Sequence, residues 1–482
     1  MIAAPSANAR TVDLLVIGGG PAGQKAAIQA AKAGRRVALI DRASAPGGEC
    51  VRRGTIPSKT LRETALHLSG LRHRAAGLSC LTRGPLDAGT KLASLMQRLD
   101  AVVLGHEHFL GAQLSRNGIE FRCGHARFEG PGRVRVVHSD GGSQLYAPKH
   151  VVLATGSRPR QVPGFEVDGH HIVDSDTILS MEHLPSSLLV IGGGVIACEF
   201  ATVFQALDAH VTLIDRAPRP LGFLDAEIAQ RFTRSFQASG GVLLPSVDPV
   251  GVEVDKEHDG VRPVRCRLAD GREFRAEVVL LALGRRAALD GLGLETVGIN
   301  PNARGFLDVD ANFRTDAPGV YAVGDVIGPP SLATSAMEQG RRAALHALGL
   351  PPPGGRDLVP IGIYTIPELA SVGLAEAEAR AQHGEIRVGR SAFDELARGQ
   401  INGALDGLLK LITDREGRRI LGVQVVGEGA AELVHLGQIA MLGDLSVETF
   451  VDHVFNFPTY AEAYRVAALD VLGQCARALH AA

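Results

Sequence analysis

Glycines recur with one fixed spacing in two segments of the sequence, each time between an apolar run and a helical pattern. In the first, Gly18-x-Gly20-x-x-Gly23 follows the apolar run 13–17, and Asp41 lies 23 residues after Gly18. The first glycine allows a tight turn, the second lets a pyrophosphate approach the backbone, and the third lets a helix pack on the strand. Asp41 has the chemistry to accept a hydrogen bond from a ribose hydroxyl. Strand, helix and acidic residue together favour a dinucleotide site over a plain glycine turn.

The second segment repeats this scheme. The string VIGGG occurs twice, 174 residues apart, and the second copy continues as Gly192-x-Gly194-x-x-Ala197 and ends on Asp215. Alanine at the last position is allowed by the fingerprint. Two such units in one chain indicate two bound dinucleotides, and two dinucleotides that face each other imply electron transfer, typically between a flavin and a nicotinamide.

Other apolar runs supply strands that would position these turns. The runs 150–154, 278–283 and 319–323 each end in a glycine-containing turn, namely Thr155-Gly156, Gly284-Arg285 and Gly324-Asp325. Such turns bring backbone to the carboxyl edge of a parallel sheet, where α/β proteins bind ligands. We also expect a helix over 332–347, a linker at 351–355, and a last region with its own elements, including 407–413, 420–426 and 430–442. The predicted fold is therefore α/β, with two Rossmann-like domains and a smaller C-terminal domain.

Length and composition exclude several classes of protein. The chain has 482 residues, enough for about two to four domains, with 45% hydrophobic and 21% charged residues. The formal net charge of −2 offers no basic excess for a phosphate backbone, so we expect no nucleic-acid partner. No run of about 18 apolar residues predicts a membrane span, and the N-terminal residues do not read as a secretory signal.

The cysteines do not form a recognisable framework. Cys50, Cys80, Cys123, Cys198, Cys266 and Cys475 are scattered, without a C-x-x-C pair or zinc spacing. We therefore expect no metal site, no structural disulfide and a reducing, cytoplasmic setting.

The segment after the first nucleotide unit carries a resemblance to a known family. Gly47-Gly48-Glu49-Cys50 leads to Thr55-Ile56-Pro57-Ser58-Lys59, and the chain resembles the pyridine nucleotide–disulfide oxidoreductases, whose pattern here is GG-x-C-x4-C-x-PSK. The resemblance runs over nearly the whole chain and includes the following motifs: Ala154–Gly156, Leu283–Arg286, Tyr321–Val326, Tyr364–Gly373 and Phe457–Arg465. In that family the two cysteines form a redox disulfide, and a histidine from the partner subunit is the acid/base.

The sequence departs from that pattern at both reactive positions. The second cysteine position is Thr55, and the residue before Pro458-Thr459 is Phe457. A threonine cannot form a disulfide and a phenylalanine cannot move a proton. Dithiol substrates are therefore rejected. The pattern that remains is similar to the soluble, Si-specific pyridine nucleotide transhydrogenases, which use FAD to pass hydride between NADPH and NAD⁺.

This resemblance implies a division of the chain and a set of site residues. It implies an FAD domain from 1–160 and 286–350, an NAD(P) domain from 161–285, and a dimerisation domain from 356–482 that gives Phe457 and Glu462 to a neighbouring subunit in a homodimer or higher oligomer. The residues expected to bind FAD are Gly18, Gly20, Gly23, Asp41, Arg42, Gly47, Gly48, Cys50, Lys59, Thr155, Gly156, Gly324, Asp325 and Ala333. Those expected at NAD(H) or NADP(H) are Gly192, Gly194, Ile196, Glu199, Asp215, Arg216, Arg219 and Gly284.

Two of these residues are expected to be catalytic. By resemblance Lys59 and Glu199 pair beside flavin N5; the alternative is that both are surface charges. The implied mechanism is ping-pong, in which both nicotinamides use one pocket in turn. The alternatives are an NAD(P)H:quinone or dye reductase and a flavoprotein sensor with negligible turnover. Cys50 is interpreted as a buried residue without a role in the reaction.

The nucleotide preference is open between two interpretations. Asp215 favours a free adenosine ribose, and therefore NAD, whereas Arg216 and Arg219 carry guanidinium groups suited to a 2′-phosphate. Dual specificity would use all three side chains. If the arginines are ordinary surface charges, the site is NAD-specific.

Overall fold

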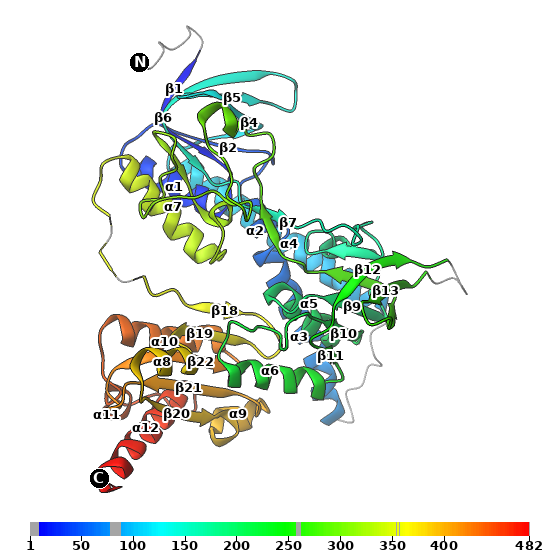
Figure 1. Ribbon diagram of the computed structural model, residues 1–482, viewed down its shortest axis with the longest axis vertical. Coiled ribbons are helices and arrows are strands. Elements are labelled where there is room, and N and C mark those ends of the chain that lie inside the picture. Colours follow the sequence, from blue (N-terminus) through cyan, green and yellow to red (C-terminus); the bar gives the residue numbers. More distant parts are fainter. Residues whose placement is uncertain (1–8, 78–87, 257–261, 353, 356, 482) are drawn as a thin grey trace. The chain divides into compact units, whose positions relative to one another are not determined.

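The computed structural model describes residues 9–77, 88–256, 262–352, 354–355 and 357–481. Its chain forms two compact units (Figure 1). The first comprises Met1–Leu61, Thr90–Gln161 and Leu283–Gly354, and the second comprises Arg62–Gly89, Val162–Ala282 and Gly355–Ala482. Cys80 lies outside the described residues, and so does Pro353, which belongs to the predicted linker.

The first unit is built around a seven-stranded sheet in the order β3-β2-β1-β6-β5-β4, with β17 also paired to β6. Its strands are β1 (Arg10–Ile17), β2 (Val37–Asp41), β3 (Glu120–Cys123), β4 (His125–Gly130), β5 (Arg133–Val137), β6 (Ser143–Leu153) and β17 (Val320–Ala322). The strand β6 changes partner along one edge, because its first half pairs antiparallel with β5 and its last residues pair parallel with β17. The strands β1, β6 and β17 therefore end together at one edge.

Two helices of the first unit pack closely on each other. They are α1 (Pro21–Lys32) and α7 (Ala333–Ala347). A Cβ added at Gly340 would lie 2.1 Å from the carbonyl oxygen of Ala22, so the two backbones touch at this crossing. The helix α1 ends before Gly34, which adopts a φ of +73°, as a glycine beyond a helix end does. The shorter helix α2 (Gly48–Arg52) follows β2. The long helices α3 (Thr55–Gly77) and α4 (Ala88–Arg116) were not predicted from the sequence.

The second unit contains a five-stranded parallel sheet in the order β11-β10-β9-β15-β8. These strands are β8 (Ile172–Asp174), β9 (Ser187–Ile191), β10 (His210–Ile214), β11 (Val242–Leu244) and β15 (Val278–Leu281). The helix α5 (Val195–Ala206) links β9 to β10, and α6 (Ala226–Ala238) links β10 to β11. A three-stranded antiparallel sheet follows, formed by β12 (Pro249–Val254), β13 (Val264–Leu268) and β14 (Glu273–Ala276).

The C-terminal part of the second unit is an antiparallel five-stranded sheet in the order β18-β19-β22-β21-β20. Its strands are β18 (Ile361–Ile363), β19 (Leu369–Gly373), β20 (Arg387–Ala392), β21 (Leu408–Thr413) and β22 (Ile420–Val426). The helices are α8 (Glu376–His383), α9 (Ala397–Asn402), α10 (Ala430–Leu442), α11 (Thr449–Asp452) and α12 (Glu462–Ala481). The elements predicted at 407–413, 420–426 and 430–442 are confirmed to within a residue, as β21, β22 and α10. The domain boundaries inferred from the sequence stay a prediction.

A buried lysine ties α6 to the C-terminal sheet within the second unit. The Nζ atom of Lys410 lies 2.8 Å from Asp225 Oδ1 and 3.0 Å from Glu376 Oε2. Lys410 is 1% exposed and Asp225 is 3% exposed. Asp225 also caps α6, because its Oδ1 accepts from the amides of Glu227 and Ile228. Burial lowers the pKa of Lys410, but the hydrogen bonds and charges of Asp225, Glu376 and Glu227 together outweigh burial, and the pKa is raised. The ammonium group is therefore kept charged where the chain enters α6.

We expect Lys410→Met to lower the thermal unfolding temperature by at least about 6 °C. The change leaves the buried Asp225 carboxylate without its cation, which costs about 3–5 kcal/mol. Scanning calorimetry measures the shift. Lys149→Met is the matched control, because Lys149 pairs with Asp13 at 2.8 Å but is 69% exposed. It should shift the temperature by at most about 4 °C. Equal shifts for both variants would contradict this account.

Candidate functional site: two dinucleotide turns

The first glycine turn has the geometry that its spacing predicts. Gly18 has a φ of +110°, and a Cβ there would lie 2.1 Å from the carbonyl oxygen of Ala154. A Cβ at Gly23 would lie 1.9 Å from the carbonyl oxygen of Gly18, so α1 can pack this closely only with glycine. Gly20 is the N-cap residue of α1 and offers no side chain to the first amides of the helix. Those amides are free to bind an anion.

Asp41 ends β2 directly beside this turn. Its carboxylate accepts hydrogen bonds from the amides of Gly19 and Ala43, at 2.5 and 2.9 Å. A carboxylate has about four acceptor positions, so these two bonds orient Asp41 and leave capacity for a ribose hydroxyl. Arg42 follows it and is exposed.

The segment that carries the family resemblance lies against the same turn. The amide of Gly47 donates to the carbonyl of Gly19 at 2.9 Å. A Cβ at Gly48 would lie 2.7 Å from Gly20 Cα, and Gly48 has a φ of +61°. These contacts bring α2, with Cys50, to the edge where the dinucleotide turn is.

Cys50 has the environment of a neutral thiol. Burial raises its pKa, opposed by a hydrogen bond with Thr55 and by the charge of Lys59. The cysteines among the described residues, Cys50 included, are all free. Thr55 therefore stands beside Cys50 in the place where the family pattern has its second cysteine.

A hydrogen-bonded chain fixes the carboxylate of Asp325 at this edge. Ser157 Oγ donates to Asp325 Oδ2 at 2.7 Å, and Arg285 Nε donates to Ser157 Oγ at 2.8 Å. A second guanidinium nitrogen of Arg285 donates to the Ser157 carbonyl at 2.9 Å. Because arginine can only donate, the one proton of the Ser157 hydroxyl is directed to the carboxylate. Asp325 thus reaches a ligand in one fixed orientation.

Other groups at this edge have hydrogen-bonding capacity that the protein does not use. Thr155 Oγ1 and Ser335 Oγ are buried and have no hydrogen-bond partner in the part of the chain that the structure describes. Ser335 lies in the first turn of α7, beside the predicted Ala333. A Cβ at Gly156 would meet nothing within 4 Å. The open backbone fits a ligand with a pyrophosphate. The buried hydroxyls and the oriented carboxylate fit a polyhydroxylated chain, and FAD has both parts.

The second turn has the same construction in the second unit. Gly192 has a φ of +120°, and a Cβ there would lie 2.5 Å from the carbonyl oxygen of Ala282. Gly194 is the N-cap residue of α5, and a Cβ there would meet nothing within 4 Å. Ile196 lies in the first turn of α5, and Ala197 is buried at the place of the third glycine. The repeat found in the sequence is therefore a structural repeat.

The charged loop after β10 lies beside this second turn. Asp215 is half-buried; burial raises the pKa of its carboxyl, and the amides of Ala217 and Arg216 oppose that change. The Nε atom of Arg216 lies 2.5 Å from Asp248 Oδ1. Arg219 donates to the carbonyls of Gly222 and Leu224 at 3.0 and 3.3 Å. Both arginines thus have partners within the second unit.

The two residues expected to be catalytic lie in different units. Glu199, on α5, is 7% exposed, and its Oε1 accepts from the amide of Tyr364 at 2.8 Å. Lys59, on α3, belongs to the first unit and contacts Ser58 Oγ at 3.3 Å. Glu199 is therefore not a surface charge, and its pairing with Lys59 stays a prediction. Gly284 precedes the strand β16 (Arg285–Ala287) in the first unit, where β16 pairs with β7 (Ser157–Pro159).

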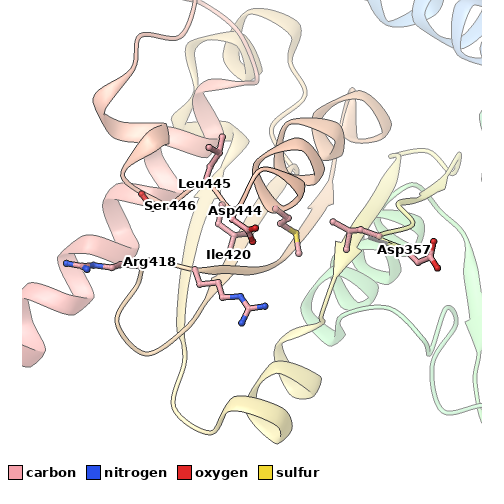
Figure 2. Close-up of a pocket in the computed structure, with 9 residues that line it drawn as sticks. Asp357, Arg418, Ile420, Asp444, Leu445 and Ser446 are labelled. Atoms are coloured by element: carbon pink, nitrogen blue, oxygen red, sulfur yellow. The ribbon is translucent and has the colours of Figure 1, made fainter. Parts of the chain in front are cut away.

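A cavity of about 480 Å³ in the C-terminal part of the second unit is a separate feature (Figure 2). Its lining includes Leu358, Arg418, Met441 and Leu445. None of the cofactor-binding or catalytic residues predicted from the sequence lines it, so it is not the candidate site.

Sequence reasoning missed Ser157, Arg285 and Asp248. Arg285 stands in a motif that was recognised, but its partner Ser157 is 128 residues away. Asp248 lies in the loop after the neighbouring strand β11, and parallel strand order is the signal that could have found it.

The comparisons with known proteins decide the family. The model of the pyridine nucleotide-disulphide oxidoreductases matches residues 12–340, and the model of the dimerisation domain of that family matches residues 359–468. The chain belongs to the pyridine nucleotide-disulphide oxidoreductase family. A member of this family is an FAD-dependent oxidoreductase that uses NAD(P)H, and the predicted fold class is confirmed. The dimerisation domain indicates a homo-oligomer.

Curated relatives of this oxidoreductase match over nearly its whole length. Proteins named soluble pyridine nucleotide transhydrogenase from Mycobacterium bovis and Marinomonas sp. are 41% and 40% identical, over 96% of this chain and 98% of theirs. A Vibrio vulnificus protein of the same name is 39% identical over 97% of this chain and 99% of its own.

Solved structures give the same result for the fold. LpdA from Mycobacterium tuberculosis has a TM-score of 0.86 at 28% identity, covering 95% of this chain and 99% of LpdA. The HOCl-induced flavoprotein disulfide reductase RclA from Escherichia coli has a TM-score of 0.84 at 25% identity with the same coverage.

Among the described residues, no helix is long and apolar enough to cross a membrane.

We expect Ser157→Ala to weaken FAD binding about fivefold, because Asp325 loses the hydrogen bond that orients it, worth about 1 kcal/mol. Asp325→Ala should weaken binding at least about tenfold. Flavin fluorescence during titration of the apoprotein measures both. Asp316→Ala is the control, since Asp316 is an exposed carboxylate of the same unit. Wild-type affinity in both test variants would show that this chain of hydrogen bonds does not serve the cofactor.

Proposed function

We propose that this oxidoreductase passes hydride between NADPH and NAD⁺ by way of its FAD, as a transhydrogenase. The observation that carries the proposal is the structural repeat: one chain has two dinucleotide turns of one construction, at Gly18 and at Gly192. The names of the curated relatives support the same reaction.

The first turn is proposed to hold FAD. When bound, FAD accepts a hydride from one nicotinamide and returns it to another. The amides at the start of α1 would bind the pyrophosphate, Asp41 the adenosine ribose, and Asp325 the ribityl hydroxyls. The remaining residues named for this site from the sequence are Gly20, Gly23, Arg42, Gly47, Gly48, Cys50, Lys59, Thr155, Gly156, Gly324 and Ala333.

The second turn is proposed to bind NAD(H) and NADP(H) in succession. The open backbone at Gly194 would bind the pyrophosphate, and Ile196 would lie near the nicotinamide ring. Asp215, Arg216 and Arg219 would meet the adenosine ribose. Because both substrates use this one pocket, the kinetics are proposed to be ping-pong.

Lys59 and Glu199 are proposed to pair beside the flavin. Glu199 already holds the amide of Tyr364, which fixes its carboxylate on α5. A positive charge held there would favour the anionic reduced flavin by Coulomb attraction. The residues thus set electrostatics and position rather than move a proton.

The proposed absence of thiol chemistry is supported by three residues. Thr55 cannot form a disulfide with Cys50, Phe457 cannot replace an acid/base histidine, and burial keeps the Cys50 thiol neutral. Hydride exchange between two nicotinamides releases no thiolate that needs a proton, so none of these functions is required.

The assembly is proposed to be a homodimer. Phe457 is 69% exposed in the single chain, and Glu462 begins α12 close behind it. Both would enter the neighbouring subunit's site. The cytoplasmic location and the three-domain division are part of this proposal.

A direct assay tests the function. Purified protein with NADPH and thio-NAD⁺ should form thio-NADH in a ping-pong pattern. A parallel assay replaces thio-NAD⁺ with a quinone. Turnover with the quinone alone would assign a quinone or dye reductase, and absence of turnover in both assays would leave a nucleotide-binding flavoprotein.

We expect Cys50→Ser to keep turnover within about tenfold of wild type, because a buried neutral thiol takes no part in hydride transfer. Cys475→Ser, on α12 and outside both dinucleotide turns, is the control. Steady-state rates measure the effect. A loss of more than about a hundredfold, about 2.7 kcal/mol of barrier, would make Cys50 a participant.

A further inference from the structure

Arg216, in the loop after β10, forms an ion pair with Asp248, in the loop after β11. Arg216 Nε lies 2.5 Å from Asp248 Oδ1, and a terminal nitrogen of Arg216 also donates to the Pro249 carbonyl at 3.5 Å. The sequence assigns Arg216 to a 2′-phosphate, but nothing there assigns Asp248. The guanidinium that would bind this phosphate is already paired with a carboxylate.

Backbone hydrogen bonds hold Asp248 in this place. The amide of Asp215 donates to the Leu244 carbonyl at 3.1 Å, and the amide of Val247 donates back to the Asp215 carbonyl at 3.0 Å. The amide of Ser246 donates to the Ala217 carbonyl at 3.0 Å. These bonds attach the loop 245–248 to the loop 215–217. Arg216 and Asp248 therefore meet because β10 and β11 are neighbours in the sheet.

The surrounding charges make this pair an obstacle to a 2′-phosphate. Asp215 directly follows β10 and precedes Arg216 in the chain, and Asp248 contacts Arg216. Arg219 is held by the carbonyls of Gly222 and Leu224. A phosphate that binds Arg216 has to share the guanidinium with Asp248 or displace it, and in either case it faces that carboxylate as a like charge. A ribose with a free 2′-hydroxyl requires neither change.

We propose that Asp248 is a specificity-determining residue, which occupies Arg216 and so biases the second site against adenine nucleotides with a 2′-phosphate. The proposal rests on the proposed function only in placing a nicotinamide dinucleotide at the second turn. It makes Arg216 a phosphate-binding residue whose availability is set by its partner.

Exposure sets the size of the effect. The side chains of Arg216 and Asp248 are 70% and 54% exposed. Exposed pairs are worth up to about 1 kcal/mol, which corresponds to about fivefold in affinity. Asp248→Asn removes the charge and keeps the shape, so it should tighten binding of a 2′-phosphorylated nucleotide by about that factor.

The test measures binding, so it does not depend on hydride transfer. Isothermal titration calorimetry measures the affinity for 2′,5′-ADP and for 5′-AMP. The affinities are compared between wild type, Asp248→Asn, Arg216→Ala and the double variant. The expected result is about fivefold tighter 2′,5′-ADP binding in Asp248→Asn, unchanged 5′-AMP binding, and no gain in the Arg216→Ala background. If this binding result is obtained but the protein does not pass hydride between NADPH and NAD⁺, the proposed function is overturned and the proposed role of Asp248 stands.

A matched control uses another exposed ion pair of the same unit. Asp270 pairs with Arg272 at 2.8 Å, both 51% exposed. Asp270→Asn removes an equal charge and should leave both affinities unchanged. The proposal is overturned if Asp248→Asn leaves 2′,5′-ADP binding unchanged, if Asp270→Asn gives the same gain, or if the gain persists without Arg216.

Discussion

Contact between the backbones of neighbouring strand ends is the constraint on which the rest of this structure depends. At Gly18 and at Gly192 the chain passes so close to a carbonyl, that of Ala154 or of Ala282, that no side chain fits. A turn this tight starts the next helix directly at the sheet edge. Because the helix is capped by glycine, its first amides keep their hydrogen-bonding capacity for an anion. A single sterically enforced turn thus occurs twice, and each copy would accept a pyrophosphate.

The two sites differ in what surrounds the turn. The first has an oriented carboxylate at Asp325 and buried hydroxyls at Thr155 and Ser335, which have no partner among the described residues. These groups would be costly to leave unsatisfied, so they favour a ligand that stays bound. The second is bordered by the exposed pair of Arg216 and Asp248, which can open and close at little cost. That contrast matches a resident cofactor at the first site and exchanging substrates at the second.

The features that depend on neighbouring residues could be predicted from the sequence, whereas those that depend on contacts between distant residues could not. Glycine spacing and apolar runs predicted the two turns, their strands and α7, because each depends on neighbours in the chain. The strand β6 begins at Ser143, before the predicted run 150–154, and its first half pairs antiparallel with β5. Polar residues in that half hid it from an apolar pattern. The Ser157–Asp325 bond joins residues 168 apart, and only the folded sheet brings them together.

Transfer of reducing equivalents through the bound flavin is the central claim, and anaerobic double mixing tests it most directly. The holoenzyme is first mixed with NADPH and then with NAD⁺, while flavin absorbance is followed. The account predicts that NADPH removes the absorbance of oxidised flavin and that NAD⁺ restores it, each at least as fast as steady-state turnover. Flavin that NADPH reduces but NAD⁺ does not reoxidise, or reoxidises more slowly than turnover, would contradict it.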